Sequence, residues 1–259
     1  MSKLAETLAI KTISETAKSG VFEIAGLYTG YGLTLGNALR RVLLSSLPGA
    51  AITRMKIKGV PHEFSTLPGM TEDIMEFTLN LKKVRLILYG PEPQTLQLRV
   101  KGIKEVTAGD IETTAQAEII NPDLRLTSLT TKNAELDMEL TVEPGLGYVP
   151  VEAGKGEKLA IGVIALDAIF SPVTRINFTV ENMRVGERTD YNRLKIMIDT
   201  DGTITPSAAL KEAANILHEH FVQVAGLEVK AVAAPVLVKA ARGRPAKKVK
   251  KAAAKTKKK

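Results

Sequence analysis

The segment that says most about this chain is GYGLTLGNALRRVLLSSLPG, residues 30–49. A glycine-rich turn precedes an amphipathic run in it, and this order predicts a helix from Thr34 to Leu47. Pro48 and Gly49 follow the run and are expected to close the helix. The glycines could instead hold a phosphate at the helix N-terminus. Their spacing matches neither a dinucleotide fingerprint nor a P-loop, so a tight turn is the favoured interpretation.

The predicted helix has two unlike faces at 100° per residue. The apolar face is expected to pack on the core, and it carries Leu35, Leu39, Val42, Leu43 and Ser46. The opposite face points outward and holds Asn37, Arg40, Arg41, Leu44 and Ser45. Leu44 is either an ordinary exposed leucine or the anchor of a protein interface with a polar rim, and the helix alone leaves both open.

Two further segments have helical patterns. The first runs from about Glu72 to Leu81, with Thr71 as its expected N-cap. The second runs from about Pro206 to Val224, with Thr205 as N-cap and proline at the first position. Its apolar stripe at 3–4 spacing packs either on the chain's own sheet or against another helix in a dimer. The stripe consists of Leu210, Ala213, Ala214, Leu217, Phe221 and Val224.

Strand-like alternation is more frequent than helical periodicity. Five half-buried strands are predicted, beginning near Thr53, Leu96, Leu136, Ile176 and Leu194. Several antiparallel strands with few helices indicate an α+β fold.

The composition excludes several classes of protein. A chain of 259 residues without cysteine forms one or two domains and has no disulfide, thiolate metal site or cysteine nucleophile. No apolar run approaches the length of a membrane span, and the N-terminus does not have the pattern of a secretory signal. No catalytic constellation is evident, because Asp199–Gly202 is best interpreted as a turn and the three histidines lack metal-site spacing.

The net charge of +8 is concentrated at the C-terminus. Residues 230–259 hold twelve Lys or Arg and no acid, whereas residues 1–229 have a net charge of −4. We expect this tail to be disordered and to carry any nucleic-acid affinity. Its Arg242-Gly243-Arg244-Pro245, followed by Lys247 and Lys248, resembles the AT-hook core that lies in the minor groove of A·T-rich DNA. A generic phosphate-binding tail is the alternative.

Ordered blocks of sequence resemble the α subunit of bacterial or plastid DNA-dependent RNA polymerase. They begin with residues 32–49 and continue through His62–Thr66, Glu72–Ile74 and Leu79–Lys82. Further blocks are 147–150, 171–173, 187–190 and 201–204. The blocks follow the family order over most of residues 20–225, so the chain is identified as similar to the N-terminal domain of that subunit.

The resemblance implies a two-subdomain fold. Residues 1–48 and 171–229 would form a discontinuous dimerisation subdomain, residues 49–170 an inserted, mostly β subdomain, and residues 230–259 the tail. It implies a homodimer whose core is built by the first and third helices, through Leu35, Leu39, Leu43, Leu210, Ala213, Ala214, Leu217, Phe221 and Val224.

The resemblance also implies assembly with other polymerase subunits. Asn37, Arg40, Arg41, Leu44 and Ser45 would contact the β subunit. Lys82, Ser171, Pro172 and Val173 would lie at the β′ contact, with omega and sigma in the wider complex. The chain would supply no catalytic residue and no cofactor to this nucleotidyltransferase, and magnesium would belong to the catalytic subunit. We expect the bacterial cytoplasm near the nucleoid, or alternatively a plastid stroma, and no membrane.

Family members usually continue into a compact DNA-binding C-terminal domain, and the sequence given has the basic tail where that domain is expected. The tail is therefore expected to contact upstream DNA through residues 242–248. Two other functions remain open: a free-standing DNA-binding protein that depends on the tail, and a phosphate-using enzyme built on Gly30–Gly36.

Overall fold

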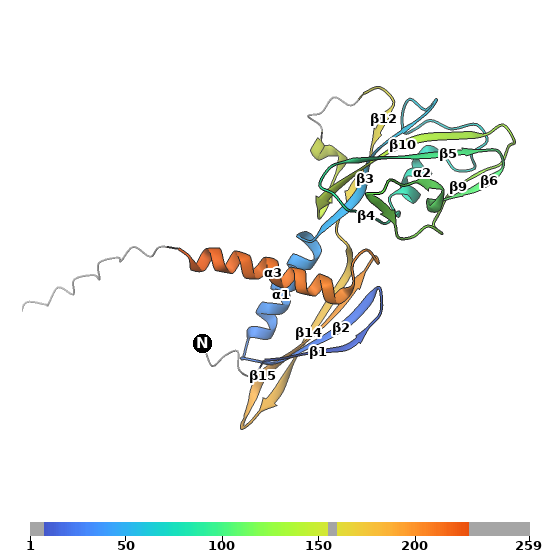
Figure 1. Cartoon of the computed structure of the whole chain (residues 1–259). Coiled ribbons are helices and arrows are strands. Elements are labelled where there is room, and N and C mark those ends of the chain that lie inside the picture. Colours follow the sequence, from blue (N-terminus) through green and yellow to red (C-terminus); the bar gives the residue numbers. More distant parts are fainter. Residues whose placement is uncertain (1–7, 155–159, 228–259) are drawn as a thin grey trace, which may run out of the picture.

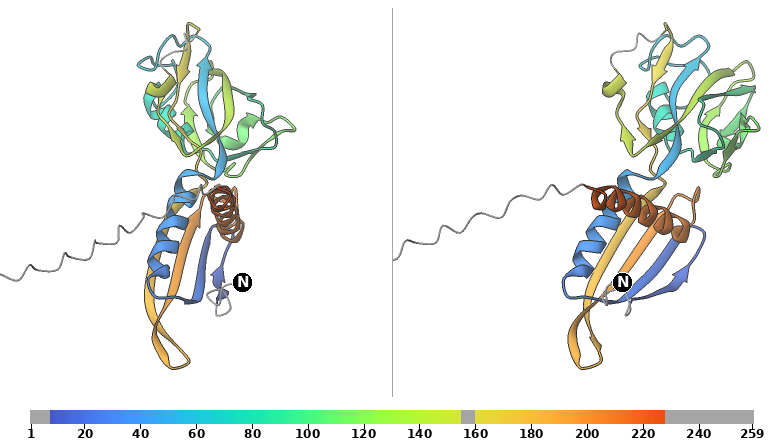
Figure 2. Two further views of the ribbon diagram at one scale, coloured as in Figure 1. Left: turned by 90° about the vertical axis from the view of Figure 1, so that its left-hand side faces the viewer. Right: turned by 60° about the vertical axis from the view of Figure 1, so that its left-hand side comes forward.

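The computed structural model describes residues 8–154 and 160–227 (Figure 1). This part of the chain holds three α-helices and several sheets, in which every strand pairing is antiparallel. The predicted α+β class is confirmed. The two largest apolar clusters belong to two lobes that stand one above the other in Figures 1 and 2.

The first lobe is built on a four-stranded sheet with the order β1-β2-β15-β14. The strands are β1 (Ala9–Glu15), β2 (Ser19–Leu27), β14 (Val173–Val185) and β15 (Arg188–Thr200). Helices α1 (Tyr31–Ser45) and α3 (Pro206–Ala225) contact each other and the sheet, and α3 crosses α1 in Figure 1. Segments from the first and the last part of the described chain thus share one apolar core, which includes Phe22, Leu43 and Ile196.

The second lobe is a run of chain inserted between α1 and β14. Its main sheet has the order β12-β3-β10-β5-β7. These strands are β3 (Pro48–Ile57), β5 (Gln94–Lys101), β7 (Ile111–Glu112), β10 (Glu135–Leu146) and β12 (Val163–Ala165). Helix α2 (Ile74–Leu81) contributes Ile74, Phe77 and Leu81 to the core of this lobe, all fully buried.

Three small two-stranded sheets complete the inserted lobe. They are β4 (Leu86–Leu88) with β8 (Ala117–Ile119), β6 (Lys104–Thr107) with β9 (Arg125–Leu129), and β11 (Tyr148–Val149) with β13 (Ala168–Ile169). Two 3₁₀ turns also belong to this lobe: η1 (Ala108–Asp110) lies between β6 and β7, and η2 (Val151–Gly154) lies between β11 and β12.

The alternating apolar residues behave as the sequence predicted. In β10, Leu136, Met138, Leu140 and Val142 are all at most 1% exposed, and the residues between them are exposed or half-buried. The period of two places one face of each strand on the core. The same holds for Leu96, Leu98 and Val100 on β5.

Both ends of α1 and the C-terminal end of α3 differ from the predicted ones. Helix α1 begins three residues before Thr34, because Gly30 adopts a positive φ of 86° that turns the chain directly into the helix. It ends at Ser45 rather than Leu47, and Pro48 already begins β3. The predicted end of α3 is off by one residue, and its N-cap Thr205 is confirmed, with its hydroxyl 3.4 Å from the backbone N–H of Ala208.

Thr71 is not the N-cap of α2. Asp73 takes that position and accepts a hydrogen bond of 2.6 Å from the backbone N–H of Glu76. Glu72 turns away to β9, where its carboxylate accepts hydrogen bonds from Thr127 Oγ1 and the backbone N–H of Ser128. Burial raises the pKa of Glu72, but these bonds together with the backbone of Glu72 itself and the charge of Arg125 outweigh burial and hold its pKa below the ordinary value.

The two lobes are joined where the chain crosses between them twice. The outgoing crossing is Pro48–Gly49 at the start of β3, and the returning one follows β13 through Phe170. A Cβ on Gly49 would lie 1.8 Å from the carbonyl oxygen of Phe170, so the two crossings touch through their backbones. Beside them, Arg85 Nε of the inserted lobe lies 3.7 Å from Asp201 Oδ2 of the first lobe.

Candidate functional site: protein-binding surfaces on both lobes

The first lobe has an open apolar groove between β1, β2, α1 and α3, here named the α1–α3 groove. Its volume is about 720 Å³, and most of its exposed lining is carbon. The apolar residues that line it are Leu8, Ile10, Phe22, Ile24, Tyr31, Leu35, Ala38, Leu39, Leu210, Ala214, Leu217 and Phe221. An exposed apolar hollow of this size on a folded lobe indicates a surface that binds another apolar surface.

Helix α1 packs on the sheet through small residues as well as large ones. A Cβ on Gly36 would lie 2.7 Å from the Phe178 ring, and one on Gly32 would lie 2.7 Å from Val180 Cγ1. These two glycines therefore let the helix lie directly on β14. The close approach buries Leu39 and Leu43 at 3% and 0% exposure.

This packing corrects part of the predicted dimer surface. Leu39, Leu43 and Ala213 are core residues of one protomer, and Leu43 and Ala213 have no exposed surface to give to a partner. The helical period placed Leu39 and Leu43 on the core side of their helix, and only the family resemblance assigned them to the dimer seam. For Ala213 the stripe alone left packing within the chain and packing in a dimer both open. Leu35 is half-buried and does line the groove.

The second half of α3 is the more exposed part of the predicted stripe. Leu210, Ala214, Leu217 and Phe221 line the groove. Phe221 is 65% exposed, and the apolar residues that follow it are also exposed: Val222 by 56%, Val224 by 61% and Leu227 by 71%. This end of α3 extends past the sheet (Figure 1), so its apolar side chains have no cover within the described part of the chain.

The outward face of α1 is as predicted from the helical period. Asn37, Arg40, Arg41 and Ser45 are exposed, and Leu44 among them is 38% exposed. Ser45 Oγ donates a hydrogen bond of 2.7 Å to the carbonyl of Arg41, one turn earlier in the helix. The structure thus gathers two guanidinium groups around one exposed leucine, a pattern typical of an interface anchor with a polar rim.

The four residues predicted near a β′ contact, Lys82, Ser171, Pro172 and Val173, differ in how far their side chains are buried. Lys82 Nζ lies 2.8 Å from Asp167 Oδ2, and the same carboxylate accepts a bond of 3.0 Å from the backbone N–H of Val151. The hydrogen bond from Lys82 and that from Val151 hold the pKa of Asp167 below its ordinary value.

Val173 and Pro172 are buried, and Val173 belongs to the core of the first lobe. They cannot present their side chains to a partner, which corrects their assignment as contact residues. Ser171 is half-buried and donates to the carbonyl of Val173 at 3.4 Å.

The glycine-rich turn is not open to an anion. Asn192 Oδ1 accepts hydrogen bonds from the backbone N–H of Gly30 at 2.8 Å and of Gly32 at 3.4 Å. Asn192 is 6% exposed, so a buried amide occupies the position that a phosphate would need. The interpretation as a tight turn is confirmed.

The acidic turn Asp199–Gly202 is also structural. Asp201 Oδ1 accepts hydrogen bonds from the backbone N–H and the hydroxyl of Thr203, and Gly202 has a φ of 100°. Among the described residues no cluster of His, Asp or Glu has the arrangement of a metal site. Arg242–Lys248 of the tail lie outside the described residues.

The strand pair β1–β2 is the functional element that the sequence analysis missed. Leu8, Ile10 and Thr12 of this edge form one wall of the groove. The signal was present as the alternation of Phe22 and Ile24 with Glu23 and Ala25, which is typical of a strand. No helix in the described residues is long and apolar enough to cross a membrane.

Taken together, the geometry defines a class: a two-lobed α+β protein whose prominent surfaces are suited to binding other proteins. A family model described as the RNA polymerase Rpb3/RpoA insert domain matches residues 55–171. The DNA-directed RNA polymerase subunit alpha of Limosilactobacillus reuteri is 47% identical over 231 residues, which cover 88% of this chain and 73% of the relative. That of Symbiobacterium thermophilum is 50% identical over 208 residues, 80% of this chain and 66% of the relative.

The chain belongs to the family of DNA-directed RNA polymerase α subunits. The aligned part spans about two thirds of the length of these relatives. The predicted resemblance is therefore confirmed at the level of the family.

Proposed function

We propose that this chain is a homodimeric scaffold that nucleates the assembly of DNA-directed RNA polymerase by binding the β and β′ subunits. The observation that carries the proposal is the α1–α3 groove together with the uncovered apolar end of α3. Both features lie in the first lobe, within residues 1–48 and 171–229, which we propose as the dimerisation subdomain.

The groove and the helix end are suited to each other. In a twofold-symmetric dimer the same patch serves both copies, so α3 of each protomer would place Phe221 and Val224 against the groove of the other. Leu210, Ala214, Leu217 and Leu35 would form the floor, where the small Ala214 permits close helix approach. Burial of the exposed apolar side chains of the groove and of the α3 end would supply the driving force.

The outward face of α1 is the proposed β site. It faces away from the lobe's own core, because Leu39 and Leu43 on the opposite side are buried. Leu44 would insert into a pocket of β, while Arg40 and Arg41 pair with acidic groups around it. Asn37 and Ser45 would add hydrogen bonds at the rim.

The β′ contact is proposed near Lys82 and Ser171, with Asp167 as the residue that orients Lys82. The chain itself would be non-catalytic and hold no cofactor, while magnesium acts in a catalytic subunit. The basic residues Arg242, Arg244, Lys247 and Lys248 are proposed to contact upstream DNA through phosphates or the minor groove. The proposed place of action is the bacterial cytoplasm, at the nucleoid.

Dimerisation can be tested by sizing Phe221→Asp. Phe221 is 65% exposed in one chain, so the variant should fold, and a buried carboxylate in the seam should make it monomeric at micromolar concentration. Leu79→Asp is the matched control, because Leu79 is 54% exposed on a helix of the other lobe. If Phe221→Asp stays dimeric, the seam lies elsewhere.

Assembly can be tested by capture of purified β subunit with tagged, dimeric chain. Arg41→Ala and Leu44→Ala should remain dimeric and lose β, while Lys132→Ala, a change at an exposed residue in the turn before β10, should retain it. If the wild-type chain captures neither β nor β′, the scaffold function is refuted, and DNA binding by the tail becomes the leading function.

A further inference from the structure

The inserted lobe carries a second apolar surface, centred on the β11–β13 ribbon. Tyr148 pairs with Ile169 and Val149 pairs with Ala168 across its two strands. Directly paired residues share a face, so one face shows Tyr148 and Ile169, at 59% and 42% exposure. The other face shows Val149, also 42% exposed. A ribbon this small with apolar side chains on both faces has too little of its own chain to cover them.

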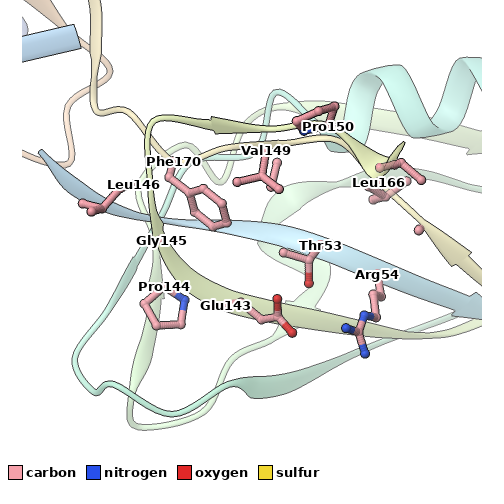
Figure 3. A pocket seen from close by; sticks show the side chains of 13 residues that line it. Thr53, Arg54, Glu143, Pro144, Gly145, Leu146, Val149, Pro150, Leu166 and Phe170 are labelled. Atoms are coloured by element: carbon pink, nitrogen blue, oxygen red, sulfur yellow. The ribbon is translucent and has the colours of Figure 1, made fainter. Parts of the chain in front are cut away.

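A pocket lies beside the Val149 face, here named the ribbon pocket. It has a volume of about 580 Å³ and is walled by Thr53 and Arg54 in the middle of β3, by the end of β10 and by the residues around the ribbon (Figure 3). Leu146, at 56% exposure, and Val151, at 37%, line it together with Val149, Leu166 and Phe170. Its exposed lining is mainly apolar, so an apolar side chain is the ligand it suits.

The ribbon is held in place by hydrogen bonds. The carbonyl of Gly147 accepts bonds from the backbone N–H groups of Phe170 at 2.8 Å and Ser171 at 3.2 Å. Asp167 bonds both the N–H of Val151 and the ammonium of Lys82, which ties the end of the ribbon to α2. A surface whose shape is fixed before binding loses little entropy on binding.

The ribbon is continuous with the outward face of α1. A Cβ on Gly147 would lie 3.2 Å from the carbonyl oxygen of Ser45, so the start of the ribbon lies on the last turn of that helix. In Figures 1 and 2 the segment that carries β11 and η2 stands over the same end of α1 from every side shown. One surface thus runs from Arg41 and Leu44 across Ser45 to Tyr148.

We propose that the ribbon and its pocket are the second half of the β-binding surface, and that they receive an apolar segment of the same β subunit that binds α1. This inference rests on the proposed function, because the partner is the one assigned to α1. The partner segment would carry apolar side chains for Val149 and the ribbon pocket, next to acidic groups that face Arg40 and Arg41. Covering both faces of the ribbon would fix the inserted lobe relative to the partner.

The test is the affinity of purified β subunit for the full-length dimeric chain, measured by biolayer interferometry. Val149→Asp should raise the Kd by about tenfold or more, because a carboxylate would enter an apolar contact. Tyr148→Ala should raise it by a smaller factor without adding charge. Ile103→Asp is the matched control and should leave the Kd unchanged, since Ile103 is 65% exposed at the turn between β5 and β6. Circular dichroism and sizing establish that each variant is folded and dimeric.

A photo-crosslinker placed at position 148 gives a readout of contact that does not depend on affinity. It should attach to β, and the same crosslinker at position 103 should not. The ribbon proposal would be overturned if Val149→Asp and Tyr148→Ala bind β with unchanged affinity and position 148 gives no crosslink. If Arg41→Ala still loses β in that case, the proposed α1 site stands.

Two other outcomes separate the two proposals. If the ribbon variants weaken β binding and the α1 variants do not, the ribbon stands and the α1 site fails. A crosslink from 148 to a second copy of the chain, or to β′ alone, would overturn the assignment of the partner.

Discussion

Among the glycines that the structure describes, Gly49 is the one where an added methyl group would come closest to another atom. It lies in β3 opposite Gly145 of β10, at the point where the chain leaves the first lobe. The Phe170 backbone crosses directly over it, and the Phe170 ring lies over Gly145, where a Cβ would be 2.6 Å from the ring. Two facing glycines thus make the space through which the returning crossing passes.

The expected size of the effect follows from that geometry. A Cβ on Gly49 would be 1.8 Å from the carbonyl oxygen of Phe170, whereas unstrained contacts between such atoms lie near 3.5 Å. Both sides are backbone, so no rotamer change relieves the overlap, and the cost is about 3 kcal/mol. The entropy gained by replacing glycine offsets at most about 1 kcal/mol. We expect Gly49→Ala to lower the free energy of unfolding by about 2–3 kcal/mol.

Urea unfolding followed by circular dichroism measures this change. With a slope of about 2–3 kcal/mol per molar urea, the midpoint should fall by about 1 M. Gly90→Ala is the control, because its Cβ would be 3.6 Å from the nearest atom, Gln116 Oε1, and should shift stability by less than about 0.5 kcal/mol. Equal midpoints for the two variants would refute the reasoning that the crossing requires glycine.

Three further effects are expected. Glu72→Gln should destabilise the protein by about 1–2 kcal/mol at neutral pH. The folded pKa of Glu72 lies below its ordinary value of 4.5, so the stability that its carboxylate contributes is complete above pH 4.5 and is lost as the pH falls through the folded pKa. The urea midpoints of wild type and variant should therefore converge in acid. A double-mutant cycle with Arg85→Ala and Asp201→Ala should give a coupling free energy of about 0.5–1 kcal/mol. Asp201→Ala should be the more destabilising single change, because the Asp201 carboxylate also accepts the hydrogen bonds of Thr203. Additive effects would show that no ion pair forms between the lobes. Asn192→Leu should cost about 1–2 kcal/mol in thermal unfolding, because two backbone N–H groups at the start of α1 lose their acceptor, and an unchanged Tm would contradict that capping role.

The candidate site was only partly readable from sequence. The helical period separated Arg40, Arg41 and Leu44 from the core side of α1, because a helix fixes which residues share a face. It could not tell that Ala213 on α3 is covered within one chain while Phe221 on the same stripe is left open. That difference depends on how much sheet lies beneath each helix, which no local pattern records.

The sequence by itself determined the local order of this protein: strands from alternation with a period of two, α3 from its cap and stripe, and the α+β class from their proportions. Its ordered blocks also determined the family. Only the tertiary structure decided where the surfaces lie, because contacts between distant residues set them. Asn192 closes the turn at Gly30, Phe170 requires glycine at position 49, and β13 joins Tyr148 and Val149 into a ribbon above α1. Each is a long-range contact whose two halves look ordinary until the chain brings them together.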